Sequence, residues 1–363
     1  MNALVLIPGR TGLHYARVAL GDGGTPPTCE PRGTTTSVRD VQAVLTANHK
    51  DTAIDVVSIH SIYGGKDFGS PVLLDEGTER RLLGLAVQAP LSVAKAAAVV
   101  DEARSVFPQT PIALAFETSF FVDLPSRETT YALPSELGGA VRRWGYHGLF
   151  HEAAVAQFEQ TLPHKRPARV LSICLESRPE IAAVIGHTPL MVTSGSTPIE
   201  GLPGEYNSGE IDPAIALALA SDTTLGPERA NIVLTRESGF FGMLGWPATM
   251  REVLTLKRAR VARVREHLFY RMLLAAGSGL AALEDIDGVV FSGPYAEYAA
   301  PVASYLMPRL ERTLDRRPGS LPWQSCHLPL ESIVAEAGAT ALLGGGGALS
   351  GRWTPSQPSG LGA

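Results

Sequence analysis

Two histidines and two arginines stand close together in the stretch R-R-W-G-Y-H-G-L-F-H, which spans residues 142–151. Glycines flank His147 within two positions, an environment in which an imidazole has room to reach a ligand and exchange protons with it. We therefore expect His147 to contact a ligand or act in catalysis, together with Arg142; the alternative is that His147 only packs. His151 is expected to make a structural hydrogen bond.

Glu117 is the second candidate for chemistry because it is a single carboxylate directly after an apolar stretch. A carboxylate in this position serves either as a general base or as an ion-pair partner of a nearby arginine. The sequence leaves both interpretations open, and the partners in the second are Arg142 and Arg143.

Arg10 and His14 introduce positive or titratable groups into and just after a Gly-rich turn near the N-terminus. They are candidates for binding an anion, although an arginine in an exposed turn is more often only solvated. Cys174 is expected to be an inert core thiol, because no neighbour in the sequence lowers its pKa.

The composition restricts the class of protein. The 363 residues are too many for one ordinary core and predict about two domains. A formal net charge of −5 does not support a nucleic-acid surface. The three cysteines lack metal-binding spacing, no apolar run reaches about 18 residues, and the first residues do not read as a signal peptide. We therefore expect a cytoplasmic protein with neither a nucleic-acid nor a membrane partner.

Strands and helices alternate along the first third of the chain, which predicts an α/β architecture. A tight turn joins the first two strands, and apolar spacing marks the helices. The expected elements are a strand over 3–7, a turn over 8–12, a strand ending near 20, a loop over 21–37, a short helix from 38, a strand over 54–59, a helix capped by Ser92 that ends near 107, and a strand over 112–116.

The second half begins with another strand–turn–strand pattern, and this repeat suggests two related lobes with a cleft between them. Asp212 and Pro213 have the residue types of a helix cap and a first helical turn. The expected elements are strands over 170–175 and 181–185, a helix from 213, a long amphipathic helix that includes 261–272, and a strand over 288–291.

Six segments in collinear order resemble motifs of the acetokinase family, which comprises acetate, propionate and butyrate kinases of the actin/hexokinase/Hsp70 fold. The segments are residues 142–151 (family motif R-R-Y-G-F-H-G-T-S-H), 197–202 (T-P-L-E-G-L) with 208–213 (S-G-D-I-D-P), 237–242 (K-S-G-L-L-G), 115–120 (F-D-T-A-F) and 131–134 (Y-A-L-P). The resemblance covers residues 1 to about 340.

This resemblance implies two actin-like, ribonuclease H-like α/β lobes with a central cleft. The first lobe is expected over 1–118 plus 332–343, and the second over 119–331. The resemblance further implies a homodimer formed through the second lobe. We expect the Gly-rich tail over 344–363 to be disordered.

Site residues follow from the same resemblance. His147 matches the residue that stabilises the transferring phosphoryl group in the family. The substrate side comprises Ile62, Leu91, Tyr146 and Pro198, which line the acyl pocket, and His60, which replaces a carboxylate-binding arginine. The nucleotide side comprises Arg251, Glu297, Arg10 and His14.

Most family residues that handle phosphate are replaced in this chain. The departures are residues 7–14 (family N-A-G-S-S-S-L-K), 59–65 (H-R-V-V-H-G-G), 174–178 (H-L-G-N-G) and 294–298 (G-I-G-E-N), with Asn207 for an arginine and with Glu117 and Thr249 for aspartates. Loss of the loop glycines closes the backbone approach to phosphate, and Glu176 is expected to repel it.

The sequence therefore favours a diverged member of the family, a pseudokinase that keeps a small acyl or carboxylate pocket but has a degraded ATP-phosphate site. No residue group suggests a metal site of its own. The alternative is an active carboxylate phosphotransferase, which would use ATP and Mg²⁺ to make an acyl phosphate from a short-chain carboxylate. The fold alone does not choose between these functions.

Overall fold

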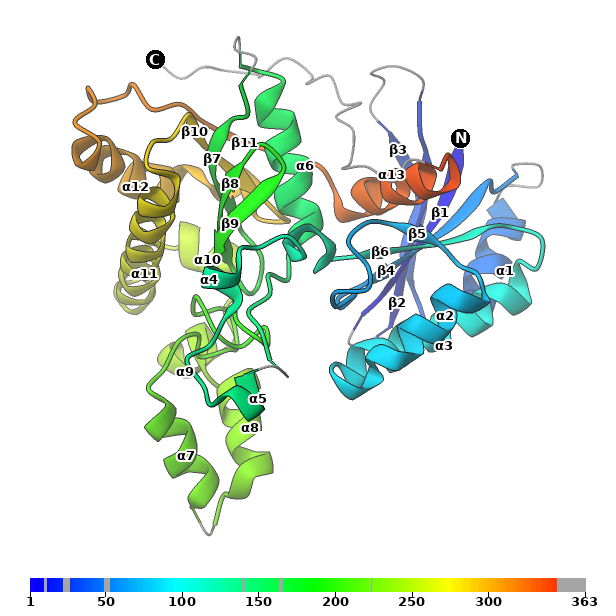
Figure 1. Ribbon diagram of the computed structural model, residues 1–363, viewed down its shortest axis with the longest axis horizontal. Helices are drawn as coiled ribbons and strands as arrows, with labels where there is room; N and C mark the ends of the chain where they lie inside the picture. The colour runs from blue at the N-terminus through cyan, green and yellow to red at the C-terminus, as the bar shows by residue number, and fades with distance from the viewer. Residues whose placement is uncertain are drawn as a thin grey trace. The chain divides into compact units, whose positions relative to one another are not determined.

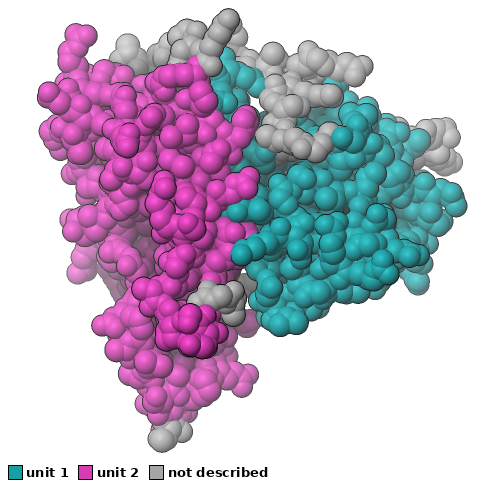
Figure 2. Space-filling view, viewed as in Figure 1, with its two compact units in different colours: residues 1–122, 148–161, 328–363 teal, residues 123–147, 162–327 magenta. Residues whose placement is uncertain are grey.

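The computed structural model describes residues 1–9, 12–21, 27–48, 53–138, 141–162, 166–222 and 224–344. The chain divides into two compact units (Figure 2). Unit 1 comprises residues 1–122, 148–161 and 328–363, and unit 2 comprises residues 123–147 and 162–327. Arg10 and residues 345–363 of the expected disordered tail lie outside the described residues.

Unit 1 is built on a six-stranded sheet in the order β3-β2-β1-β4-β6-β5. The three central strands β1, β4 and β6 run parallel, while β2, β3 and β5 pair antiparallel with their neighbours. The bounds are β1 (Asn2–Pro8), β2 (Leu13–Ala19), β3 (Thr28–Thr35), β4 (Val56–Ser61), β5 (Val72–Leu73) and β6 (Ile112–Phe116). Every residue of β4 and β6 is buried, as expected for strands covered on both faces.

Helices cover both faces of this sheet: α13 lies on one side, and α2 and α3 lie on the other (Figure 1). The bounds are α1 (Val38–Asn48), α2 (Glu76–Gly84), α3 (Pro90–Val106), α6 (Gly148–Glu159) and α13 (Leu330–Leu342). Small side chains let α13 approach closely; a Cβ on Gly338 would lie 1.7 Å from the Ser58 hydroxyl oxygen.

The structure confirms most of the expected elements of unit 1, including the β1–β2 hairpin. The loop expected over 21–37 is wrong, because residues 28–35 form β3 at the edge of the sheet. Proline and glycine are tolerated on an edge strand, so its composition resembles that of a loop. The Ser92 cap is also wrong: α3 already begins at Pro90, where proline fits the first turn.

Unit 2 contains a five-stranded sheet in the order β11-β10-β7-β8-β9. Its strands are β7 (Arg169–Cys174), β8 (Glu180–Ile185), β9 (Thr188–Val192), β10 (Gly288–Ser292) and β11 (Trp323–Ser325). Its helices are α4 (Ser126–Thr129), α5 (Ser135–Gly138), α7 (Pro213–Ser221), α8 (Gly226–Arg236), α9 (Gly239–Leu244), α10 (Met250–Thr255), α11 (Ala259–Leu283) and α12 (Ala300–Thr313). The long helix α11 packs on the sheet, and its Val261, Val264, Leu268 and Met272 are buried, as expected.

The observed units differ from the expected lobe boundaries mainly at α6, which the sequence placed in the second lobe. All but two residues of this apolar helix are buried, and it packs against α13 in unit 1. None of the described helices combines the length and apolarity needed to cross a membrane.

Candidate functional site

His147 lies at the end of a unit 2 segment and is 8% exposed. Its main-chain N–H donates to Glu180 Oε1 at 3.0 Å, and the N–H of Tyr146 donates to the same carboxylate. The ring Nε2 lies 3.0 Å from the carbonyl oxygen of Arg178. Since a carbonyl only accepts, we assign the ring proton to Nε2. His147 is thus held by the loop that follows β7.

The loop after β7 covers most of residues 174–178, the segment expected to have lost phosphate binding. The Glu176 carboxylate of this loop accepts hydrogen bonds from two donors of the same loop. Glu176 Oε2 accepts from the Ser177 hydroxyl at 2.7 Å and from the Arg178 N–H at 3.0 Å. Burial opposes ionisation, but the His147 imidazole, these hydrogen bonds and the Arg178 charge outweigh it and hold the pKa of Glu176 below its ordinary value. The loop therefore carries a built-in anion.

A second carboxylate occupies the N-terminus of α10. Glu205 Oε1 accepts from the Met250 N–H at 2.8 Å and from the Tyr295 hydroxyl at 3.0 Å. Burial raises the pKa of Glu205, and the charge of Glu176 adds to that rise. Thr249, which stands where the family has an aspartate, caps the same helix in a capping box with Glu252.

Asn207 replaces an expected arginine with a neutral, buried amide. It is 4% exposed, and its Nδ2 donates to the Leu202 carbonyl at 3.4 Å. Gly204 lies against this amide, because a Cβ there would come within 2.3 Å of Asn207 Oδ1 and of the Ser177 carbonyl oxygen. The position therefore supplies no positive charge to a ligand.

Unit 1 contains a separate buried pair, His60 and Glu117, which are 7% and 3% exposed. His60 Nε2 lies 2.8 Å from Glu117 Oε1. Glu117 Oε2 accepts from the Leu149 N–H, at the start of α6, at 3.1 Å. The side chain that contacts Glu117 is thus His60 rather than Arg142 or Arg143, since the parallel strands β4 and β6 bring these two side chains together.

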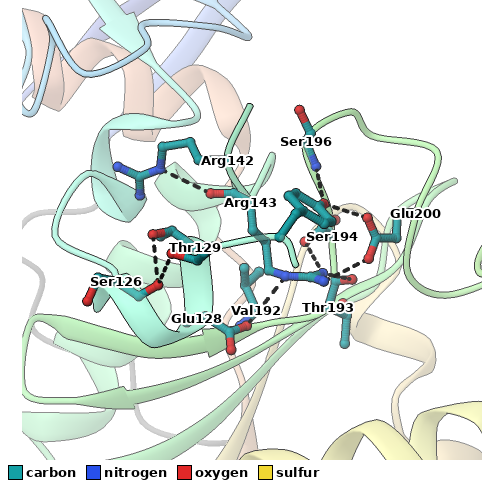
Figure 3. A network of polar contacts seen from close by, with 12 residues as sticks. Ser126, Glu128, Thr129, Arg142, Arg143, Val192, Thr193, Ser194, Ser196 and Glu200 are labelled. Atoms are coloured by element: carbon teal, nitrogen blue, oxygen red, sulfur yellow. Dashed lines mark hydrogen bonds and ion pairs between the residues drawn. The ribbon is translucent and has the colours of Figure 1, made fainter. Parts of the chain in front are cut away.

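Arg142 and Arg143 belong instead to a network within unit 2 (Figure 3). The Arg143 guanidinium donates to Glu200 Oε1 at 2.8 Å and to the Ser194 carbonyl at 2.9 Å. The Tyr131 hydroxyl donates to Glu200 Oε2 at 2.6 Å, and burial raises the pKa of Tyr131 to about 12. The Arg142 guanidinium stacks 4.0 Å from the Trp144 ring. Tyr131, Arg143 and Glu200 come from three of the family motifs quoted above, so this network joins those motifs by structural contacts.

Sequence reasoning missed two carboxylates. Glu180 holds the His147 segment, and Glu205 accepts the first N–H of α10. Glu180 carries a signal, because it is a single acid at the head of the apolar strand β8 and is fully buried. Glu205 lies in a Gly-rich loop, and nothing in its local sequence distinguishes it from a solvated acid.

Comparison with known proteins supports the same relationship as the motifs. Residues 30–314 match the sequence profile of the acetokinase family. The chain belongs to this family. It is 31% identical over 276 residues to an acetate kinase of Syntrophobacter fumaroxidans, which covers 73% of this chain and 67% of that protein. It is 30% identical over 254 residues to an acetate kinase of Nitrobacter hamburgensis, covering 69% of this chain and 62% of that protein.

Solved structures agree on the fold. A propionate kinase of Francisella tularensis superposes with a TM-score of 0.81 at 20% identity, covering 93% of this chain and 99% of that one. An acetate kinase of Porphyromonas gingivalis gives a TM-score of 0.80 at 21% identity, covering 94% and 99%. The predicted α/β fold of two actin-like lobes is therefore confirmed.

The four expected acyl-pocket residues of this acetokinase-family chain divide between the units: Ile62 and Leu91 belong to unit 1, and Tyr146 and Pro198 to unit 2. Tyr146 is buried, and its hydroxyl donates to the Ser196 carbonyl at 2.6 Å. Ile62 and Pro198 are partly exposed. Leu91 is 80% exposed, because it lies off the buried face of α3. The pocket stays a prediction.

The expected nucleotide-side residues lie on the surface or outside the described part of the chain. Arg251 on α10 and Glu297 are exposed. His14 is exposed, and its Nδ1 lies 2.7 Å from the Thr34 hydroxyl. In the adjoining turn the Gly9 N–H donates to the Gly12 carbonyl, an internal bond that removes one donor from any ligand. Among the described residues, no three His, Cys, Asp or Glu side chains group as a metal site.

Proposed function

We propose that this chain is a diverged acetokinase-family protein, which binds a small carboxylate or acyl ligand and does not phosphorylate it with ATP. The observation that carries the proposal is the Glu176 carboxylate, which accepts the Ser177 hydroxyl and the Arg178 N–H of its own loop. Phosphate binding depends on free donors, and on main-chain N–H groups above all.

Protein carboxylates also occupy other main-chain donors of unit 2. Glu205 accepts the Met250 N–H, and Glu180 accepts the N–H groups of Tyr146 and His147. Two of these acids, Glu176 and Glu205, lie near enough for the charge of Glu176 to raise the pKa of Glu205. A triphosphate approaching this part of unit 2 would meet negative charge where it needs donors.

The acyl side supports ligand binding. Ile62, Leu91, Tyr146 and Pro198 are apolar, or apolar apart from one hydroxyl, and His147 presents an imidazole in the same motif as Tyr146. Apolar residue types with a few polar groups are typical of small-ligand sites, so the sequence at the positions that match the family's acyl pocket supports this part of the proposal. Neither ATP nor Mg²⁺ is required by this proposal. A homodimer formed through unit 2 and a cytoplasmic location are further parts of it.

Calorimetry with Mg–ATP tests the proposal directly, with the acetate kinase of Syntrophobacter fumaroxidans as the positive control. We expect no binding below millimolar concentration and no acyl hydroxamate from acetate, propionate or butyrate. Ligand-observed NMR with the same carboxylates should detect binding that His147→Ala abolishes. A micromolar dissociation constant for Mg–ATP would contradict the loss of the nucleotide site.

The second candidate is an active carboxylate phosphotransferase, and the acetate kinase relatives at 30–31% identity favour it. It requires ATP and Mg²⁺ and transfer of the γ-phosphoryl group to a carboxylate. Hydroxamate formation at about 1 s⁻¹, which is the low end of ordinary enzyme turnover, would establish this function instead.

A further inference from the structure

The His60–Glu117 pair of unit 1 lies where open α/β sheets bind ligands. β4 and β6 are adjacent and parallel, His60 is the second-last residue of β4, and Glu117 directly follows β6. Both side chains therefore lie at the carboxyl ends of their strands, the edge of such a sheet at which ligands bind. Ile62, an acyl-pocket residue in the proposed function, follows His60 by two positions.

Hydrogen bonds fix the orientation of the pair. Glu117 Oε2 is held by the Leu149 N–H, so Oε1 is left to face His60 Nε2 at 2.8 Å. A carboxylate accepts, so we assign the proton of the neutral imidazole to Nε2. Nδ1 then carries the lone pair. Among the described residues, no group forms a hydrogen bond with Nδ1. This nitrogen is also absent from the set of side-chain atoms that are both fully buried and unpartnered.

We propose that Glu117 and His60 form a general-base dyad that hydrolyses activated short-chain acyl esters. A carboxylate that holds one imidazole nitrogen protonated leaves the other free to take a proton, and this arrangement underlies base catalysis in many hydrolases. His60 is the catalytic base and Glu117 a positioning residue. The proposal rests on the proposed function for the acyl ligand, and it requires no nucleotide.

The reaction uses water and the ester alone. His60 Nδ1 takes one proton from water as the water oxygen bonds to the acyl carbon. The bond between that carbon and the alcohol oxygen then breaks, and the imidazolium returns the proton to the leaving oxygen. The products are a carboxylic acid, which ionises, and an alcohol. His60 ends in its starting state.

Hydrolysis of p-nitrophenyl acetate by the full chain, followed as release of p-nitrophenolate, tests the dyad. We expect saturable turnover that His60→Arg lowers at least about 100-fold in kcat, the lower end of what a general base contributes. Arginine can still donate a hydrogen bond to the buried Glu117 but cannot act as a base, so this variant should remain folded by circular dichroism. His267→Gln, at an exposed histidine of α11, is the matched control and should stay within twofold.

Glu117→Gln separates positioning from packing. Glutamine has nearly the same shape, but its amide can donate to Nε2 and reverse the tautomer. We expect kcat to fall at least tenfold with KM little changed, and ¹⁵N NMR of the His60 ring to show loss of the Nε2–H form. A purely structural pair would show the same change of tautomer with no fall in kcat, which would overturn the proposal.

Two further outcomes would also overturn the dyad. One is equal turnover in His60→Arg and the unmodified chain, and the other is no saturable hydrolysis of p-nitrophenyl acetate. The proposed function is decided separately, by carboxylate binding in NMR and by Mg–ATP calorimetry. A chain that binds butyrate but does not hydrolyse p-nitrophenyl acetate would therefore retain the proposed function and lose the dyad.

Discussion

Glu176 and Glu205 are two nearby carboxylates whose pKa values shift in opposite directions, so they should affect stability in opposite senses. Glu176 is stabilised in its charged form by donors and by His147, whereas Glu205 loses more to burial than its two hydrogen bonds restore. A shift between folded and unfolded states makes stability depend on pH, with a sign that follows the direction of the shift.

Glu176→Gln should lower the free energy of unfolding at pH 7 by about 1.5–3 kcal/mol, as expected for hydrogen bonds to a charged group. The lowered pKa means that the Glu176 contribution is present above the ordinary glutamate value of about 4.3 and is lost as pH falls through the folded-state value. Urea unfolding at pH 7 and near pH 4 should therefore show the gap to the unmodified chain closing in acid. A gap independent of pH would contradict this assignment.

Glu205→Gln should behave differently. The amide oxygen can still accept from Met250 and Tyr295, while the buried charge is removed. A raised carboxyl pKa penalises the folded state above that value, so the variant should be as stable as the unmodified chain at pH 8, or more stable by up to about 1 kcal/mol. This advantage should shrink as pH falls and Glu205 takes up a proton. Destabilisation at pH 8 would show that the charge itself is needed.

At the level of elements, contact with Glu117 fixes where α6 begins. A Cβ on Gly148 would lie 2.1 Å from the Glu117 carbonyl oxygen and 2.8 Å from the Phe120 Cβ. The Gly148 N–H also donates to that carbonyl at 3.1 Å. The first residue of α6 is thus pressed against the segment that carries the His60–Glu117 pair.

Gly148→Ala should cost about 3 kcal/mol or more, at the upper end for overpacking, because backbone and buried side chain would have to shift. Gly277→Ala in α11 is the matched control, since its Cβ would meet nothing within 4 Å. That control should gain about 0.5–1 kcal/mol from helix propensity. Chemical denaturation measures the change in the free energy of unfolding for each variant. Changes of the same sign and size in both variants would contradict the prediction.

The sequence predicts the parallel strands of unit 1 because β4 and β6 are short, continuous apolar runs. It does not predict β3, whose Gly, Pro and Thr content is acceptable only at a sheet edge. His60 and Glu117 are each found as candidates, but their pairing is not, because it depends on the register of two strands separated by 50 residues of chain. Local patterns contain no information about that register.

At the scale of the molecule, the retained motifs and the replaced ones have different roles. Arg143 and Glu200, from motifs that survive, support the unit 2 network (Figure 3). The replaced positions include Glu176 and Asn207, where phosphate-handling residues are expected. Contacts that hold the fold are needed whatever the reaction, so high fold similarity is compatible with a changed activity.

At the same scale, unit 2 exposes an apolar surface on α7. None of the residues of α7 is buried, although its sequence is P-A-I-A-L-A-L-A-S. Ile215 and Leu217 are 51% and 67% exposed. Exposed apolar patches on folded chains commonly mark interfaces. We therefore predict that the homodimer proposed for unit 2 includes α7.

Leu217→Glu should weaken that dimer at least tenfold in dissociation constant, because it would bury an unpaired charge against apolar side chains and a tenfold change needs only about 1.4 kcal/mol. Light scattering across a concentration series should show the unmodified chain as a dimer and the variant shifting to monomer. Val87→Glu is the matched control, since Val87 is 91% exposed and belongs to unit 1. It should leave the dimer intact. An unmodified chain that is monomeric at tens of micromolar would refute the dimer, and a Leu217→Glu variant that dimerises normally would move the interface away from α7.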